Sequence, residues 1–236
     1  MQPKKVAQLK KYDYLCPKLS SSMKSGAIIT GDIVNSTKLT VEGRDLMLKN
    51  LQLIPEVLAP VQSVSIEIFR GDSFQLGISK AESALRCALA IRALLRSHRV
   101  HGSKVLDARL AIGIGTLDYE SDALSTSDGE AYRLSGRLLD DMNKSRLEIR
   151  TPWHEVNEEL KLPTAFADDI VSSWSQNQSK IILLSLISSK THVELSQELE
   201  ISRQMVDKSL KASKEELIEA YIKRYETLIN KHLYQI

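Results

Sequence analysis

Hydrophobic and polar positions follow regular patterns through the first half of the chain, and these patterns predict a mixed α+β fold. Alternating or clustered apolar residues predict strands at residues 27–34, 64–69, 73–78 and 106–116. Apolar residues at helical spacing predict helices at residues 39–61 and 81–98. A tight turn at Gly71 and Asp72 joins the second and third strands into a hairpin. The resulting order, βαββαβ, is that of a ferredoxin-like sheet.

The second half of the chain has a helical pattern. A helix at residues 129–142 and a strand at residues 147–150 complete the first domain, which we expect to span residues 26–163. Beyond Pro163, short apolar stretches with polar breaks predict helices at residues 167–175, 177–188, 191–200, 203–213 and 215–233. We therefore expect a separate all-α domain at residues 164–236.

Charge is nearly balanced overall but is segregated along the chain. The sequence has 32 Lys and Arg against 30 Asp and Glu, which argues against a wholly basic nucleic-acid coat or an acidic tail protein. Residues 1–25 hold six basic residues and one acidic residue, which predicts a basic N-terminal arm. Residues 202–214 hold four basic residues and one acidic residue. Contacts with phosphate are therefore expected in two short stretches.

The sequence predicts a cytoplasmic protein with no membrane span. Its apolar stretches are shorter than the roughly 20 residues that cross a bilayer. Cys16 and Cys87 lack the spacing of a zinc site and fit a reduced compartment, and Cys87 is expected to pack in a helical core. The histidines are scattered without a catalytic arrangement, so the sequence assigns no catalytic residue.

Two aspartates follow strands that should be neighbours in the sheet. Asp32 ends the first strand, and Asp72 lies in the hairpin turn, so their carboxylates are expected at one edge of the sheet. Paired carboxylates suit Mg²⁺ or Mn²⁺, which neutralises phosphate charge in phosphoryl-transfer sites. The polar residues after Asp32 are expected to lead into a helix whose free N–H groups can receive a triphosphate. Alternatively, each aspartate is only a cap or an Asx turn.

Three segments together resemble class III nucleotide cyclase domains: residues 30–37, 69–74 and 109–115. The resemblance implies that Asp32, Asp72 and the Ile33 carbonyl hold a metal ion. It also implies that the amides of three further residues bind phosphate, namely Asn35, Ser36 and Thr37. Such domains work as homodimers, which implies a homodimer here. The whole chain is most similar to the SatD family, in which a cyclase-like domain is joined to a helix-turn-helix.

The sequence departs from the cyclase pattern at two places. Where cyclases carry a Lys or Glu that reads the purine, this chain has Ile68, so base selection is missing or has moved. Where cyclases carry an Asn and an Arg on one helix face, this chain has Arg133 and Arg137. These two arginines are expected to bind a nucleotide phosphate, although a solvated helix face explains them equally well.

Residues 191–214 resemble a helix-turn-helix of the sigma-region-4 or resolvase kind. Thr191 and Glu194 form a predicted capping box, and apolar residues are spaced for two short helices with Ser202 capping the second. Glu200 occupies the turn position where glycine is common. The residues expected to contact DNA are Ser202, Arg203, Gln204, Lys208 and Lys211. The alternative is a dimerisation or protein-docking unit.

These patterns predict a DNA-binding transcriptional regulator whose divergent cyclase-like domain binds metal and a nucleoside triphosphate. The alternative is an active class III cyclase whose C-terminal helices are a docking module. A third interpretation is a dimerising interaction protein. The partners expected for the first interpretation are double-stranded DNA, a nucleoside triphosphate and a second copy of the chain.

Overall fold

The computed structural model describes residues 24–69, 71–100, 104–117, 124 and 128–234. The N-terminal arm predicted at residues 1–25 and the thiol of Cys16 therefore lie almost wholly outside the described residues. The strands are β1 (Ser25–Ile33), β2 (Ser65–Phe69), β3 (Ser73–Ile78), β4 (Arg99–Val100), β5 (Lys104–Val105), β6 (Ala108–Thr116) and β7 (Leu147–Arg150). The predicted strands agree with these within a few residues, except that the short pair β4 and β5 was not predicted.

The helices run through both halves of the chain. They are α1 (Val41–Leu58), α2 (Ala84–Arg96), α3 (Glu130–Asp141), α4 (His154–Ser173), α5 (Gln176–Ile187), α6 (His192–Glu198), α7 (Arg203–Ala212) and α8 (Glu215–Tyr234). Short 3₁₀ turns precede α1 and α2, at Ser36–Lys38 and Ala81–Ser83.

A five-stranded sheet of order β2-β3-β1-β6-β7 forms the centre of this mixed α+β fold. Neighbouring strands are antiparallel except β6 and β7, which are parallel. The two strands of the predicted hairpin, β2 and β3, are paired, and Gly71 in their turn has a φ of 82°, a left-handed conformation that favours glycine.

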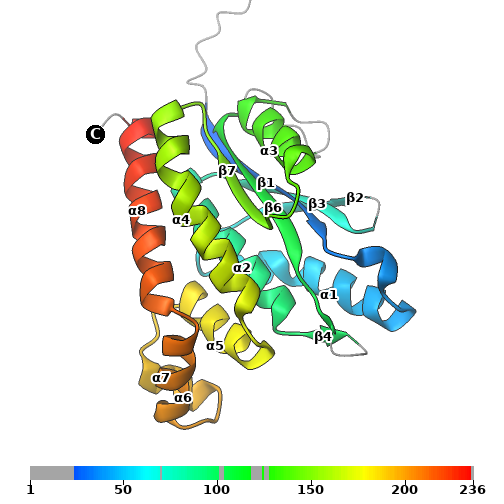
Figure 1. Cartoon of the computed structure of the whole chain (residues 1–236), viewed down its shortest axis with the longest axis vertical. Helices are drawn as coiled ribbons and strands as arrows, with labels where there is room; N and C mark the ends of the chain where they lie inside the picture. The colour runs from blue at the N-terminus through cyan, green and yellow to red at the C-terminus, as the bar shows by residue number, and fades with distance from the viewer. Residues whose placement is uncertain (1–23, 70, 101–103, 118–123, 125–127, 235–236) are drawn as a thin grey trace, which may run out of the picture.

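The two faces of the sheet differ because side chains alternate along each strand. Ile29, Leu76 and Ile112 point into the main hydrophobic core, against α1 and α2. The other face carries α3 over β6, β1 and β7 (Figure 1). A Cβ on Gly113 would lie 2.3 Å from the Ala131 carbonyl oxygen, so glycine is what lets α3 approach β6 so closely.

Helix α4 runs through Pro163, where the sequence predicted the end of the first domain. Pro163 lies near the middle of the helix. A proline inside a helix removes a backbone hydrogen bond and costs about 3 kcal/mol. Here a buried stripe offsets that cost, because Val156, Leu160, Ala167 and Val171 keep helical spacing on both sides of the proline. The core cluster also extends without a break from the sheet strands to α8.

The C-terminal helices pack on α2 and α4 rather than standing apart from the sheet. Helix α5 packs on α2, and α8 packs on α4. In Figure 1, α6 and α7 lie at the bottom of this helical group, at the opposite end of the molecule from α3. In the described part of the chain, no helix has both the length and the apolar composition needed to span a bilayer. Cys87 is buried in α2 as predicted, and burial raises the pKa of its thiol to about 12.

Candidate functional site

Asp32 and Asp72 lie at the same end of the sheet, as the sequence predicted. Asp32 is the penultimate residue of β1, where it is paired with Ser73 of β3 on one side. The residue before Ser73 is Asp72, and its carbonyl oxygen accepts a hydrogen bond of 3.0 Å from the amide of Ile33. The backbone therefore ties the end of β1 directly to the hairpin turn.

Arg109 forms an ion pair with Asp32 that the sequence did not predict. It lies opposite Asp32 in the β1–β6 pairing. Its Nε donates to Oδ1 of Asp32 at 2.9 Å, and its Nη2 donates to Oδ2. The side chains are 32% and 24% exposed, and the hydrogen bond to Asp32 raises the pKa of Arg109. Both carboxylate oxygens of Asp32 are therefore already engaged.

The segment after Asp32 differs from the prediction. Asn35 has a left-handed φ of 58°, and Ser36–Lys38 forms only a short 3₁₀ turn. The α-helix starts later, at Val41, where the Thr40 side chain accepts a hydrogen bond of 3.2 Å from the amide of Gly43. Asn35, Ser36 and Thr37 are therefore not the first turn of an α-helix.

Ser36 nevertheless reaches the site, because its hydroxyl donates to Oδ2 of Asp72 at 2.5 Å. Asn35 and Thr37 are exposed. Of the three residues predicted to bind phosphate, the structure therefore places Ser36 in contact with Asp72, a predicted metal ligand.

The polar face of the sheet carries the site, and Ile68 is not on it. Ile68 packs on the main core, on the same face as its cross-strand partner Phe74. On the opposite face, Gln75 donates to Thr30 at 3.1 Å and Thr30 donates to Ser135 of α3 at 2.9 Å. Asp32 shares its face of β1 with this polar row, and Ile68 lies on the opposite face of the sheet.

The structure does not bring Arg133 and Arg137 to the aspartates of the same chain. Both arginines are exposed on α3, whereas Ala131 and Ser135 face the sheet. Since residues in a helix are about 100° apart, positions 133 and 137 point away from the sheet. Arg133 pairs instead with Asp128 at 2.8 Å.

The oxygens at this end of the sheet suit a divalent cation under two conditions. Carboxylate and carbonyl oxygens are the ligands that Mg²⁺ and Mn²⁺ prefer. Within the described residues, no group of three or more His, Cys, Asp or Glu side chains is arranged to hold a metal ion. An ion at Asp32 and Asp72 would therefore need further oxygens, such as those of a phosphate, and Arg109 would have to release Asp32.

Five charged side chains form a cluster next to the end of β1, with Arg92, Arg96 and Asp107 buried and Arg146 and Asp168 partly exposed. Arg92 donates to both oxygens of Asp107, at 2.9 and 3.0 Å, and to Asp168 at 2.6 Å. Arg96 and Arg146 each donate to Oδ2 of Asp107 at 2.8 Å. Burial alone would raise the pKa of Asp107, but the three arginines together hold it below its ordinary value.

Helices α6 and α7 are joined by a tight turn at residues 199–202. Both hydrogen bonds of the predicted capping box between Thr191 and Glu194 are present. Ser202 caps α7 by accepting a hydrogen bond of 3.2 Å from the amide of Met205. Glu200 has a left-handed φ of 53°, which explains why glycine is common at this position.

The residues predicted to contact DNA are all exposed on or beside α7. They are Ser202, Arg203, Gln204, Lys208 and Lys211. The buried side of the helix consists of Val206 and Leu210. The acidic residue of the helix, Asp207, is held by His192 at 2.6 Å. The exposed side of α7 is therefore polar and basic.

Replacing Glu200 by glycine is expected to raise the free energy of unfolding by about 1 kcal/mol, because glycine adopts a positive φ without the Cβ clash. Thermal or urea unfolding measures the change. Glu158→Gly is the control, since this exposed position lies inside α4, in its second turn, where glycine costs about 1 kcal/mol. Equal destabilisation by both substitutions would show that Glu200 is not strained.

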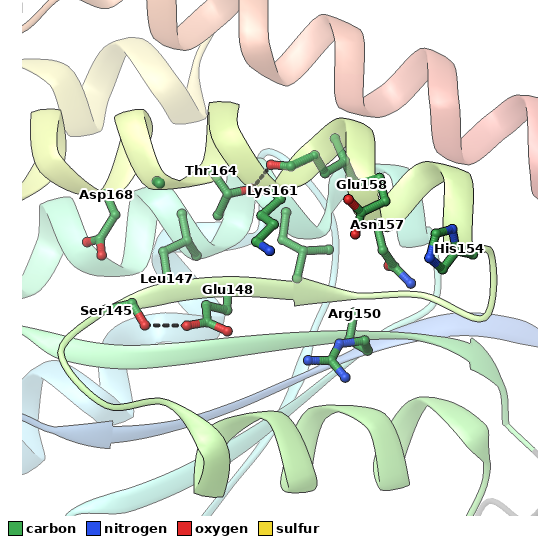
Figure 2. Close-up of a pocket in the computed structure, with 13 residues that line it drawn as sticks. Ser145, Leu147, Glu148, Arg150, His154, Asn157, Glu158, Lys161, Thr164 and Asp168 are labelled. Carbon is green, nitrogen blue, oxygen red and sulfur yellow. Dashed lines mark hydrogen bonds between the residues drawn. The ribbon is translucent and has the colours of Figure 1, made fainter.

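A cavity of about 510 Å³ lies between β7 and α4, away from the aspartates. Figure 2 shows Arg150 and Lys161 among the residues that line it, together with Glu148 and Glu158. Glu148 accepts a hydrogen bond from Ser145, and Asp168 accepts one from Arg92. Charges of both signs line the cavity, and they do not select one class of ligand.

Comparison with known proteins gives only a loose likeness. No protein-family model and no curated protein matches the chain. Among solved structures, it is similar to the active GGEEF domain of a diguanylate cyclase from Vibrio cholerae, with 18% identity over 50% of this chain and 75% of that one and a TM-score of 0.37. It is also similar to the monomeric guanylyl cyclase domain of the RhoGC fusion protein from the aquatic fungus Blastocladiella emersonii, with 17% identity over 51% of this chain and 77% of that one and a TM-score of 0.40. TM-scores this low do not assign a shared fold.

Proposed function

We propose that the protein is a DNA-binding regulator in which a nucleoside triphosphate and a divalent metal bind at the end of β1. The proposal places it in the cytoplasm, with a ferredoxin-like, cyclase-type domain and a C-terminal helix-turn-helix, as in the SatD family. The observation that carries it is the exposed basic side of α7, with its five candidate DNA contacts accessible and its two apolar residues turned inward.

The chemistry of α7 favours DNA over a docking partner. Its ten residues span about 15 Å, a length that fits the major groove. Arg203 and Gln204 lie at its N-terminal end, where base edges are usually reached, and Lys208 and Lys211 lie where phosphates are contacted. A protein-docking face is expected to be rich in large apolar side chains, and on α7 Met205 is the large apolar side chain that is exposed.

The nucleotide site uses the residues gathered around Asp32. Asp32, Asp72 and the Ile33 carbonyl would hold Mg²⁺ or Mn²⁺, which would neutralise phosphate charge. Asn35, Ser36 and Thr37 would donate to the phosphates. The guanidinium of Arg109, released from Asp32 when the metal binds, would be free to pair with a phosphate oxygen. Arg133 and Arg137 point outward and would contact the nucleotide only from a second copy, which makes a homodimer part of the proposal.

Calorimetric titration with Mn²⁺ and each of the four common nucleoside triphosphates tests the site. We expect one or more to bind, and Asp32→Asn and Asp72→Asn each to weaken binding by at least about tenfold, since a charged ligand of the metal is lost. Asp45→Asn, at an exposed position on α1, is the matched control and should leave the affinity unchanged.

Three results of the same titration have different meanings. Absence of binding by all four triphosphates would contradict the nucleotide site. Equal binding by the wild type and both aspartate variants would place the nucleotide elsewhere. Appearance of a cyclic product would instead identify the protein as a nucleotide cyclase.

A further inference from the structure

A continuous series of buried hydrogen bonds leads from the end of β1 to the end of α7. It begins at Val34, two residues after Asp32, whose amide donates to the carbonyl oxygen of Asp107 at 2.9 Å. The position of the loop that follows Asp32 is therefore fixed by the backbone of Asp107. The Asp107 carboxylate, in turn, belongs to the buried arginine cluster.

Arg96 connects Asp107 to the junction between α4 and α5. Its Nη1 donates to Asp107 at 2.8 Å. Its Nη2 donates to two backbone carbonyls, of Ser172 at 2.7 Å and of Trp174 at 2.8 Å. One planar guanidinium thus holds both a carboxylate at the sheet and the last turn of α4, which an ammonium group cannot do with the same geometry.

Trp174 completes the connection to α7. Its indole Nε1 donates to the carbonyl oxygen of Ser213 at 3.0 Å. Ser213 is the C-cap of α7, and Lys214 beside it has a left-handed φ of 58°. This hydrogen bond therefore holds the C-terminal end of α7 against Trp174.

These groups are buried, so they are expected to move together. Asp107 is 3% exposed, Arg96 7%, Trp174 1% and Ser213 0%. Moving one of them alone would leave a charged or polar group buried without its partner, which is costly. The cluster also contains three guanidinium groups against the carboxylates of Asp107 and Asp168, and no group among the described residues accepts a hydrogen bond from the buried Nε of Arg96. The buried carboxylates and guanidinium groups therefore depend on one another for their hydrogen bonds.

We propose that Asp107, Arg96 and Trp174 couple the nucleotide site to α7, so that occupancy at the end of β1 changes the position or mobility of α7. This inference rests on the proposed function. A ligand shifts such an equilibrium only if it binds one arrangement better. The differential contact here is at Asp32, because Arg109 has to release this carboxylate before it can hold a metal ion, and Val34 follows two residues later.

Amide hydrogen exchange of residues 203–214 tests the coupling in the full-length protein, with and without Mn²⁺ and the triphosphate that binds best in calorimetry. In the wild type we expect exchange in this segment to change by about fivefold or more, the lower end of typical allosteric coupling. In Trp174→Phe, which keeps an aromatic side chain but removes the donor to Ser213, the change should disappear while nucleotide affinity is retained. Trp153→Phe is the matched control, since Trp153 packs on His232 outside this series, and it should respond like the wild type.

A second variant keeps the test decisive if Trp174→Phe does not fold. Arg96→Lys keeps the charge but cannot span Asp107 and both carbonyls, and it should also lose the response. Nucleotide binding without any change in exchange at residues 203–214 of the wild type would overturn the coupling alone. Absence of nucleotide binding would overturn the proposed nucleotide site and the coupling with it.

Discussion

Replacing Asp107 by asparagine is expected to lower the free energy of unfolding by about 3–5 kcal/mol, the usual effect of removing one partner from a buried ion pair. Asp107 accepts hydrogen bonds from Arg92, Arg96 and Arg146, and Arg92 is fully buried. Asparagine fills the same space, but it carries no charge to balance three guanidinium groups. Chemical unfolding at pH 7 measures the change. For a chain of this length, the melting temperature should fall by roughly 10 °C.

The destabilisation caused by Asp107→Asn should be smaller at low pH than at neutral pH. The pKa of Asp107 lies below its ordinary value in the folded protein, so its contribution is fully present above the unfolded-state pKa of about 4 and is lost as pH falls through the lower folded pKa. The difference between wild type and variant should therefore be constant from about pH 5 to pH 8 and shrink below about pH 4.

Asp169→Asn serves as the control for Asp107→Asn. Asp169 is exposed on α4, next to Asp168, which takes part in the cluster. An exposed aspartate contributes little to stability, so this variant should unfold like the wild type. Equal stability of all three proteins at pH 7 would show that the buried cluster does not stabilise the fold.

The sheet could be predicted from the sequence because its strands have a clear pattern. Residues such as Ile29, Leu76 and Ile112 recur at alternate positions, and the period of two determines which face each strand buries. The course of α4 could not be predicted in the same way. Pro163 is a strong local signal for the end of a helix, and only the buried stripe on both sides, a tertiary effect, overrides it.

The shared location of Asp32 and Asp72 could be predicted from the sequence, but their partner Arg109 could not. Strand ends that are neighbours in the sheet bring Asp32 and Asp72 together, and sheet order is a consequence of the strand pattern. Arg109 was missed as a partner of Asp32, since an ion pair across strands depends on their register. Arg92 and Arg96 did leave a signal, because two arginines four residues apart in a helix that is apolar apart from them and Arg86 predict buried charges that need acidic partners.

Replacing Lys208 and Lys211 together by alanine is expected to weaken binding to duplex DNA roughly 50-fold at 0.1 M salt, because each lost phosphate contact lowers the slope of log affinity against log salt by about 0.9. Both lysines are exposed on α7. Fluorescence anisotropy with a labelled duplex of mixed sequence, repeated at several salt concentrations, gives the affinity and the slope. The slope should become shallower by about 2 in the double variant.

The double variant Lys223→Ala and Lys231→Ala distinguishes a phosphate contact at α7 from a general effect of positive charge on the protein surface. It removes the same charge from exposed positions of α8, so a loss of affinity confined to the α7 variant would place the phosphates at α7. Equal losses in both variants would indicate nonspecific attraction of DNA to the whole surface. If the wild type shows no salt-dependent binding to duplex DNA, α7 does not contact phosphate, and the two short helices are better explained as a docking or dimerisation unit.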